Sequence, residues 1–223
     1  MPRIERVVVP GYPHHVTQRG VRRMDVFFSE TDRRDYLTFI SRKGREHGVD
    51  YLAWCLMANH VHLVAIPATE GSLAKGIGEA HKRYTRMINA RYGWKGYLFQ
   101  GRFFSCPVEP SWLLSVVRYV LRNPVRAGVA RTPWEYHWSS ARWMVGDSTS
   151  DPLVTDIGPL VEVPDWRAFL QTHEFDRSRI RKHTQTGRPM GGQAFTRHVE
   201  RMLGRILDKK RQGSPPDHRG HIP

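Results

Sequence analysis

The chain has 223 residues, of which 35 are Lys or Arg and 21 are Asp or Glu, so its formal net charge is +14. This length suffices for one well-cored domain with an extension, since single domains typically have about 100–200 residues. Such a charge balance favours a polyanionic partner, with nucleic acid as the first candidate. There is no run of about 18 apolar residues and no signal-peptide pattern, so we expect a cytoplasmic protein that does not enter a membrane.

The chain contains two cysteines, Cys55 and Cys106, each inside an apolar, strand-like run. Two thiols in a chain of this size form neither a disulfide framework nor a paired-cysteine metal site. We therefore expect both to be small buried apolar residues.

The first predicted elements are a strand and a helix. Residues 15–19 alternate in polarity and are followed by Gly20, which predicts a strand that ends in a turn. Residues 31–47 carry apolar side chains at helical spacing, with Thr31 as the candidate N-cap and Gly48 as the stop signal.

A hairpin, a second helix and another strand follow. The apolar runs 51–57 and 61–66 are separated by only two residues, which is the spacing of a tight hairpin. Residues 72–92 show a helical apolar period with a cationic face on another side. Residues 103–108 predict a strand, and Pro107 places it at a sheet edge.

A third predicted helix at 111–122, ended by Pro124, completes the order β-α-β-β-α-β-α within residues 1–146. This order predicts an α+β fold of the ferredoxin-like split βαβ class, with an antiparallel sheet, helices on one face and an additional helix. A fold class alone does not identify the chemistry.

The C-terminal part predicts a basic, partly helical extension at 147–207. A short helix is expected near Trp166, and 193–207 form a clearer amphipathic helix. Eleven basic and two acidic residues lie within 177–211. Residues 208–223 lack enough apolar side chains to pack, so we expect a disordered tail.

The sequence His60-Val61-His62 places two imidazoles on one face of a strand, because successive side chains point to opposite faces. Imidazole is a common ligand of divalent metals, so metal binding is one interpretation. The other is a half-exposed histidine pair on a sheet face, and the motif alone favours that second interpretation.

Tyr119 lies about 140° around the third helix from the centre of its apolar arc, so core packing does not explain it. Arg118 and Arg122 flank it on the same helix, and Asn123 stands four residues on, at a spacing that shares a face. Asn123 could contact a metal or a phosphate, although Pro124 disfavours helical geometry at the preceding residue.

Cationic and aromatic residues mix over 75–102, as they do in sites for single-stranded nucleic acid. The alternative is a solvated helix face beside core aromatics, but the charge bias has one sign, which favours binding. The candidate nucleic-acid contacts are Arg19, Arg22, Arg23, Lys82, Arg83, Arg86, Arg102, Arg118 and Arg122.

Residues 56–64, Leu-Met-Ala-Asn-His-Val-His-Leu-Val, resemble the signature of the HUH transposases that have one catalytic tyrosine. The motifs at 15–20, 99–103, 119–128 and 138–140 are similar, in the same order, to those of the REP-associated branch (REP, repetitive extragenic palindrome). The resemblance covers about residues 5 to 145.

Gly187-Arg188-Pro189 and the helix that follows resemble the C-terminal extension of that branch. Two positions depart from the family pattern, and neither removes a chemical group. Ala58 stands where relatives usually have proline, and Phe99 where tryptophan is common.

By this resemblance, residues 1–146 are an HUH single-tyrosine transposase catalytic domain in which Tyr119 is the nucleophile and His60, His62 and Asn123 hold the metal. The implied cofactor is Mg²⁺ or Mn²⁺, whereas ligand softness alone favours manganese or zinc. The implied activity is that of a single-stranded DNA endonuclease and strand transferase that acts on hairpin-forming repeats through a 5′-phosphotyrosine. Relatives include both monomers and homodimers, and both states stay open.

Two other functions fit the same residues. The first is a non-catalytic DNA-binding regulator derived from a transposase, against which the presence of all four site residues argues. The second is a metal-dependent hydrolase that uses water and leaves Tyr119 idle. A carboxylate next to the histidines would favour the hydrolase, and none is adjacent in sequence.

Overall fold

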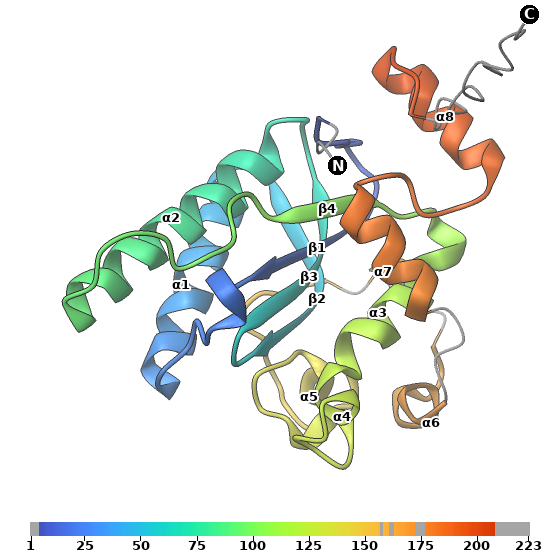
Figure 1. Ribbon diagram of the computed structural model, residues 1–223. Helices are drawn as coiled ribbons and strands as arrows, with labels where there is room; N and C mark the ends of the chain where they lie inside the picture. The colour runs from blue at the N-terminus through green and yellow to red at the C-terminus, as the bar shows by residue number, and fades with distance from the viewer. Residues whose placement is uncertain (1–4, 157, 161–162, 173–176, 208–223) are drawn as a thin grey trace, which may run out of the picture.

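A four-stranded antiparallel sheet, in the order β2-β3-β1-β4, forms the centre of the protein (Figure 1). The computed structural model describes residues 5–156, 158–160, 163–172 and 177–207, so the predicted tail at 208–223 lies outside the described residues. The strands are β1 (His14–Arg19), β2 (Val49–Met57), β3 (His60–Pro67) and β4 (Phe104–Pro107). This strand order confirms the predicted α+β split βαβ class, and β4 is the edge strand that the position of Pro107 indicated.

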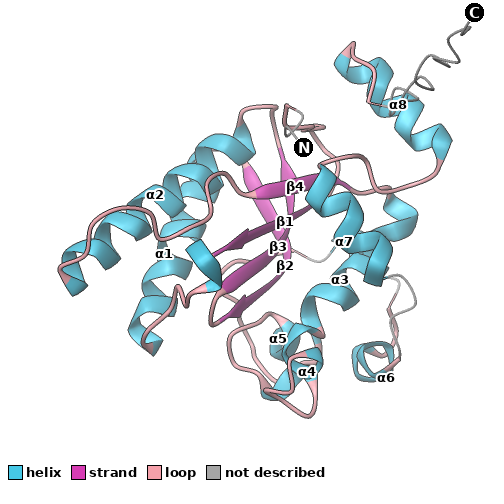
Figure 2. Cartoon of the chain, in the orientation of Figure 1, coloured by secondary structure: helices cyan, strands magenta, loops and turns pink. Residues whose placement is uncertain are grey.

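One face of the sheet packs on α1 (Glu30–Glu46) and α2 (Ser72–Tyr92) (Figures 1 and 2). The prediction of Thr31 as the cap of α1 is wrong. The Ser29 side chain accepts a hydrogen bond from the Asp32 amide, because α1 begins one residue before Thr31 and leaves that residue inside the first turn. Helix α2 has the predicted bounds and ends at Gly93, which has a left-handed φ of 68°.

The opposite face, named here the second face, is covered by α3 (Leu113–Leu121), α4 (Asn123–Arg126) and α7 (Arg177–Thr186) (Figure 2). The predicted helix at 111–122 corresponds to α3, which begins two residues later and ends at Leu121, and the chain leaves helical geometry at Arg122 before α4 begins with Asn123 and Pro124. Helix α7 was not predicted, because only Ile180 and Thr184 of its ten residues are buried and they make no apolar stripe.

In the described ranges, three further α-helices lie outside these layers: α5 (Ala141–Met144), α6 (Trp166–Gln171) and α8 (Gln193–Leu203). Helices α6 and α8 are those predicted near Trp166 and at 193–207, with α8 ending earlier, at Gly204, which has a φ of 61°. Phe195 and Val199 of α8 pack in a small separate core with Val7 and Val9 of the N-terminal segment.

The extension also packs on the sheet, since the Asp151 carboxylate accepts a hydrogen bond from Trp54 Nε1 at 2.8 Å. The domain boundary predicted at residue 146 stays a prediction.

Cys55 and Cys106 are buried and free, as expected. Among the described residues, no helix combines the length and apolar character needed to cross a bilayer.

Between α2 and α1, the buried ring of His81 on α2 lies 2.9 Å from the hydroxyl of Tyr36 on α1, and burial lowers the pKa of His81 to about 3, with Arg6 adding to the effect. The unfolded chain protonates this ring near its ordinary pKa of about 6.5. Acid therefore favours the unfolded state, and stability falls as the pH drops below about 6.5 toward 3.

We predict that His81→Gln makes the pH dependence of stability shallower by up to about 1.4 kcal/mol per pH unit below pH 6.5. Urea denaturation of both proteins at several pH values between about 7 and 5 measures this slope. Parallel curves for wild type and variant would contradict the assignment.

Candidate active site

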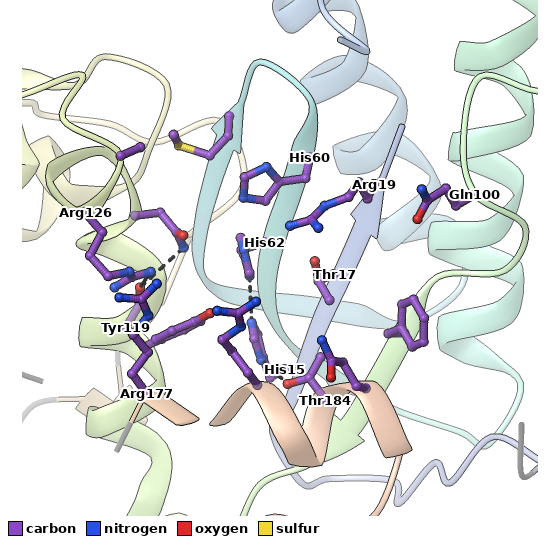
Figure 3. Close-up of a pocket in the computed structure, with 16 residues that line it drawn as sticks. His15, Thr17, Arg19, His60, His62, Gln100, Tyr119, Arg126, Arg177 and Thr184 are labelled. Atoms are coloured by element: carbon purple, nitrogen blue, oxygen red, sulfur yellow. Dashed lines mark hydrogen bonds between the residues drawn. The ribbon is translucent and has the colours of Figure 1, made fainter. Parts of the chain in front are cut away.

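A pocket of about 570 Å³ opens between the second face and helices α3, α4 and α7 (Figure 3). Its lining includes the three predicted metal ligands and Tyr119, so the structure brings all four together. The register of the sheet explains this. His60 lies opposite Arg19 and His62 opposite Thr17, so β3 and β1 turn these side chains to the same face.

The two histidines of β3 have their ring centroids 5.1 Å apart. His60 Nδ1 lies 2.6 Å from Asn59 Oδ1, and His62 Nδ1 lies 2.9 Å from Nε2 of His15. Both Nδ1 atoms are thus engaged, and Nε2 is the ring atom that each histidine can offer to a cation.

Both rings are neutral at ordinary pH, as metal binding requires. Burial lowers the pKa of His60 to about 4, and the nearby charges of Arg19 and Arg126 contribute. Burial likewise moves the pKa of His62 well below its ordinary value.

Tyr119 lies on α3 with only 6% of its surface exposed. Its ring makes edge contacts with His15 and His62, at centroid distances of 5.7 and 5.8 Å. The Arg126 guanidinium lies 4.2 Å from the ring centroid and donates to the Tyr119 carbonyl at 2.8 Å. Figure 3 shows the phenol pointing from α3 into the pocket, so its burial comes from polar rings on the second face as well as from the core.

Asn123, the first residue of α4, is buried against the last turn of α3. Its amide nitrogen donates to the carbonyls of Val120, at 3.1 Å, and Tyr119, at 3.3 Å. These two bonds engage the NH₂ group, so Oδ1 is the end of the side chain that can face a cation.

The described residues contain no group of three or more His, Cys, Asp or Glu side chains arranged to hold a metal. His15 does not complete one, because both of its ring nitrogens are hydrogen-bonded. The predicted ligands therefore offer two imidazole nitrogens and one amide oxygen, a set that fits a divalent cation of borderline character.

Positive charge surrounds these donors. Arg19, Arg126, Arg177 and Arg181 line the pocket, and among the described residues no Asp or Glu does. Burial and the charges of Arg23 and Arg181 lower the pKa of Arg19. A pocket of this charge favours an anionic group such as a phosphate.

Sequence reasoning did not assign Arg126, Arg177, Arg181, His15 or Thr184 to the site. Arg126 lies in the motif at 119–128, which could have identified it. The excess of basic residues within 177–211 was the only signal for Arg177 and Arg181.

The other predicted nucleic-acid contacts lie apart from this pocket. Arg22 and Arg23 are exposed in the turn after β1 and have left-handed φ angles of 51° and 65°. A second pocket, of about 560 Å³, contains Lys82, Arg86 and Arg102 together with Tyr97, Phe99 and Phe103. Arg83 is exposed on α2.

Arg118 and Arg122 face helix α6 rather than the pocket. Arg118 donates to Thr172 Oγ1 at 2.8 Å and lies 4.4 Å from the Phe169 ring centroid. Arg122 donates to the Leu170 carbonyl at 2.5 Å. Both arginines thus hold α6 against α3.

Residues 9–123, just over half of the chain, match the family described as "Transposase IS200 like". The chain belongs to this family of DNA-processing proteins. No protein with a curated description matches the sequence.

Among solved structures, the protein is similar to a REP-associated tyrosine transposase bound to a REP hairpin. The TM-score is 0.54 with 17% identity, over 70% of this chain and 93% of the other, so the likeness is one of fold. A candidate transposase from Deinococcus radiodurans R1 aligns with a TM-score of 0.36 and 18% identity, over 58% and 92% of the two chains, which is too weak to bear on the fold. Family and fold together confirm the resemblance to the tyrosine transposases.

We predict that Arg118→Ala loosens α6, because it removes a hydrogen bond and a cation–π contact worth about 1 kcal/mol. Hydrogen exchange at the amides of α6 should accelerate by roughly fivefold, which is the factor that such a free energy gives. Arg34→Ala, which removes an exposed arginine of α1, serves as the control. Unchanged exchange in α6 of the Arg118 variant would refute this role.

Proposed function

We propose that the protein is a metal-dependent endonuclease and strand transferase for single-stranded DNA, with Tyr119 as the nucleophile. The observation that supports this most directly is the contact of the Tyr119 ring with His62, inside a pocket lined by four arginines and, over the part of the chain that the structure describes, by no carboxylate. A phenol beside neutral imidazoles and fixed cations suits attack on a phosphodiester.

In the first step, the Tyr119 oxygen attacks phosphorus in line and loses its proton to solvent. The phosphorus–O3′ bond breaks, and the departing 3′ oxygen takes up a proton. The DNA then carries a 5′-phosphate linked to Tyr119. Attack by another 3′-hydroxyl on this linkage reverses the step and joins strands without ATP, because the bond energy is kept in the phosphotyrosine.

His60 Nε2, His62 Nε2 and Asn123 Oδ1 would hold the Mg²⁺ or Mn²⁺ ion. Such an ion supplies polarisation of the scissile phosphate and stabilises its developing charge. The chain's own contribution is positional. Arg126 packs on the Tyr119 ring and binds the carbonyl of the same residue, so it holds the nucleophile and adds positive charge beside it.

The proposed substrate is a hairpin-forming repeat in single-stranded DNA. The similar solved structure is bound to a REP hairpin, which supports this choice. The second pocket, with its lysine, arginines and aromatic rings, supplies the charge and the stacking surfaces that single-stranded nucleic acid needs.

The hydrolase alternative requires a group that activates water. In the described ranges of the chain no Asp or Glu lines the pocket, and we assign both histidines as ligands, so these residues offer no carboxylate base for that reaction. A pure DNA-binding regulator would not require a phenol turned into the pocket.

We predict that Tyr119→Phe abolishes a covalent protein–DNA adduct while DNA binding persists, since only the hydroxyl is lost. The measurement uses labelled single-stranded hairpin oligonucleotides with Mn²⁺, followed by denaturing gel electrophoresis. Tyr12→Phe, whose hydroxyl contacts His198 outside the pocket, is the matched control and should retain the adduct.

The hydrolase and the regulator predict different products on the denaturing gel. Cleavage that persists in Tyr119→Phe would establish the hydrolase. Binding with neither cleavage nor adduct in wild type, across several hairpins and metals, would establish the regulator.

We also predict that Arg181→Ala weakens binding of single-stranded DNA and reduces the slope of log affinity against log salt by about 0.7, the value for one phosphate contact. Fluorescence anisotropy at several salt concentrations measures both quantities. Arg34→Ala, on the far side of the sheet, should keep the wild-type slope. Equal slopes for wild type and Arg181→Ala would remove Arg181 from the binding surface.

A further inference from the structure

A buried chain of hydrogen bonds connects helix α7 to a predicted metal ligand. His15 Nδ1 lies 2.7 Å from Thr184 Oγ1, and His15 Nε2 lies 2.9 Å from His62 Nδ1 (Figure 3). The two imidazoles stack with an interplanar angle of 8°. At most 6% of the surface of Thr184, His15 or His62 is exposed, so water does not compete freely for these bonds.

The Thr184 hydroxyl determines which atom donates and which accepts along this series of hydrogen bonds. Its oxygen lies 2.8 Å from the Ile180 carbonyl, which can only accept, so the single hydroxyl hydrogen is donated there. Thr184 then accepts from Nδ1–H of His15. A neutral His15 with hydrogen on Nδ1 accepts at Nε2, and the donor to Nε2 is Nδ1–H of His62.

These donor and acceptor roles determine which ring nitrogen of His62 carries the hydrogen. With its hydrogen on Nδ1, His62 presents an unprotonated Nε2, which is the form that binds a cation. The reverse direction would cost the bond to the Ile180 carbonyl and put a hydrogen on Nε2 of His62, which blocks that atom as a ligand.

His60 reaches the same tautomer through a different element. Asn59 Oδ1 accepts from His60 Nδ1, and Asn59 Nδ2 donates to the Arg23 carbonyl at 3.1 Å, which fixes the orientation of the amide. His60 is therefore oriented by its own hairpin turn, whereas His62 depends on a residue 122 positions away along the chain.

We propose that Thr184 and His15 are positioning residues that hold His62 in the tautomer that binds the metal. Helix α7 of the C-terminal extension is thereby part of the metal site. This inference rests on the proposed function for the identity of the ligand, but the tautomer itself is a property of the metal-free protein.

The test compares wild type with Thr184→Val, which has nearly the same shape without the hydroxyl, and with Thr184→Ser, which restores it. Thr184→Ala is a second hydroxyl-free variant in case valine disturbs folding. Thr186→Val is the matched control, because the exposed Thr186 hydroxyl makes the same bond to its own helix, to the Lys182 carbonyl. Circular dichroism establishes that each variant is folded.

Long-range ¹H–¹⁵N spectra of the metal-free protein distinguish the protonated from the unprotonated ring nitrogen of His62. Wild type, Thr184→Ser and Thr186→Val should show hydrogen on Nδ1. Thr184→Val and Thr184→Ala should shift hydrogen toward Nε2, because Nδ1–H of His15 loses its acceptor. Mn²⁺ affinity, measured by titration, should fall about tenfold in the hydroxyl-free variants and recover in the serine variant.

One result would overturn the positioning role of Thr184, and another would overturn the metal requirement on which the proposed function depends. Wild-type His62 spectra and wild-type Mn²⁺ affinity in both hydroxyl-free variants would overturn the positioning role. If wild type bound no Mn²⁺, the metal requirement of the proposed function would fail, and the spectra of the metal-free protein would still decide whether Thr184 sets the tautomer.

Discussion

The pairing of β1 with β3 determines which side chains meet on the second face of the sheet. In the observed register, His62 lies opposite Thr17 and His60 opposite Arg19. A slip of one residue would turn both histidines toward α1 and α2, because side chains alternate between faces. The tight turn between β2 and β3 fixes the register of those two strands, since Met57 pairs directly with His60.

Among the described residues, the buried polar side chains of the pocket make their hydrogen bonds without a carboxylate. The imidazoles hydrogen-bond to one another, to Asn59 and to Thr184, and burial keeps His15 and His60 neutral by lowering their pKa values to about 3 and 4. The positive charge comes from arginines at the rim. This division, neutral donors inside and cations around them, suits a site that receives a phosphate together with a metal ion.

Local signals in the sequence predicted much of this arrangement. Strand alternation placed His60 and His62 on one face, and helical spacing grouped Tyr119 with Asn123. Thr31 was the wrong cap, because Ser29 stands two residues earlier and is at least as good a capping residue. Arg118 looked like a phosphate contact only because its partners on α6 were unknown.

Helix α7 and the role of Thr184 were beyond sequence reasoning for a physical reason. A helix with two buried residues carries almost no periodic signal, and its contact with His15 joins positions 169 residues apart. Such a contact depends on tertiary packing, which local pattern does not encode. The domain boundary at 146 therefore divides a site to which both parts contribute.

The most direct test of the central claim is to locate the covalent bond. Wild-type protein would be incubated with Mn²⁺ and single-stranded hairpin oligonucleotides with randomised flanks, and then digested with nuclease and trypsin for tandem mass spectrometry. Trypsin cuts after Arg118 and Arg122, so the peptide between these sites contains Tyr119 as its sole tyrosine. A nucleotide phosphate on Tyr119 is expected; an adduct on another tyrosine, or cleaved DNA with no adduct on any peptide, would contradict the role of Tyr119 as nucleophile.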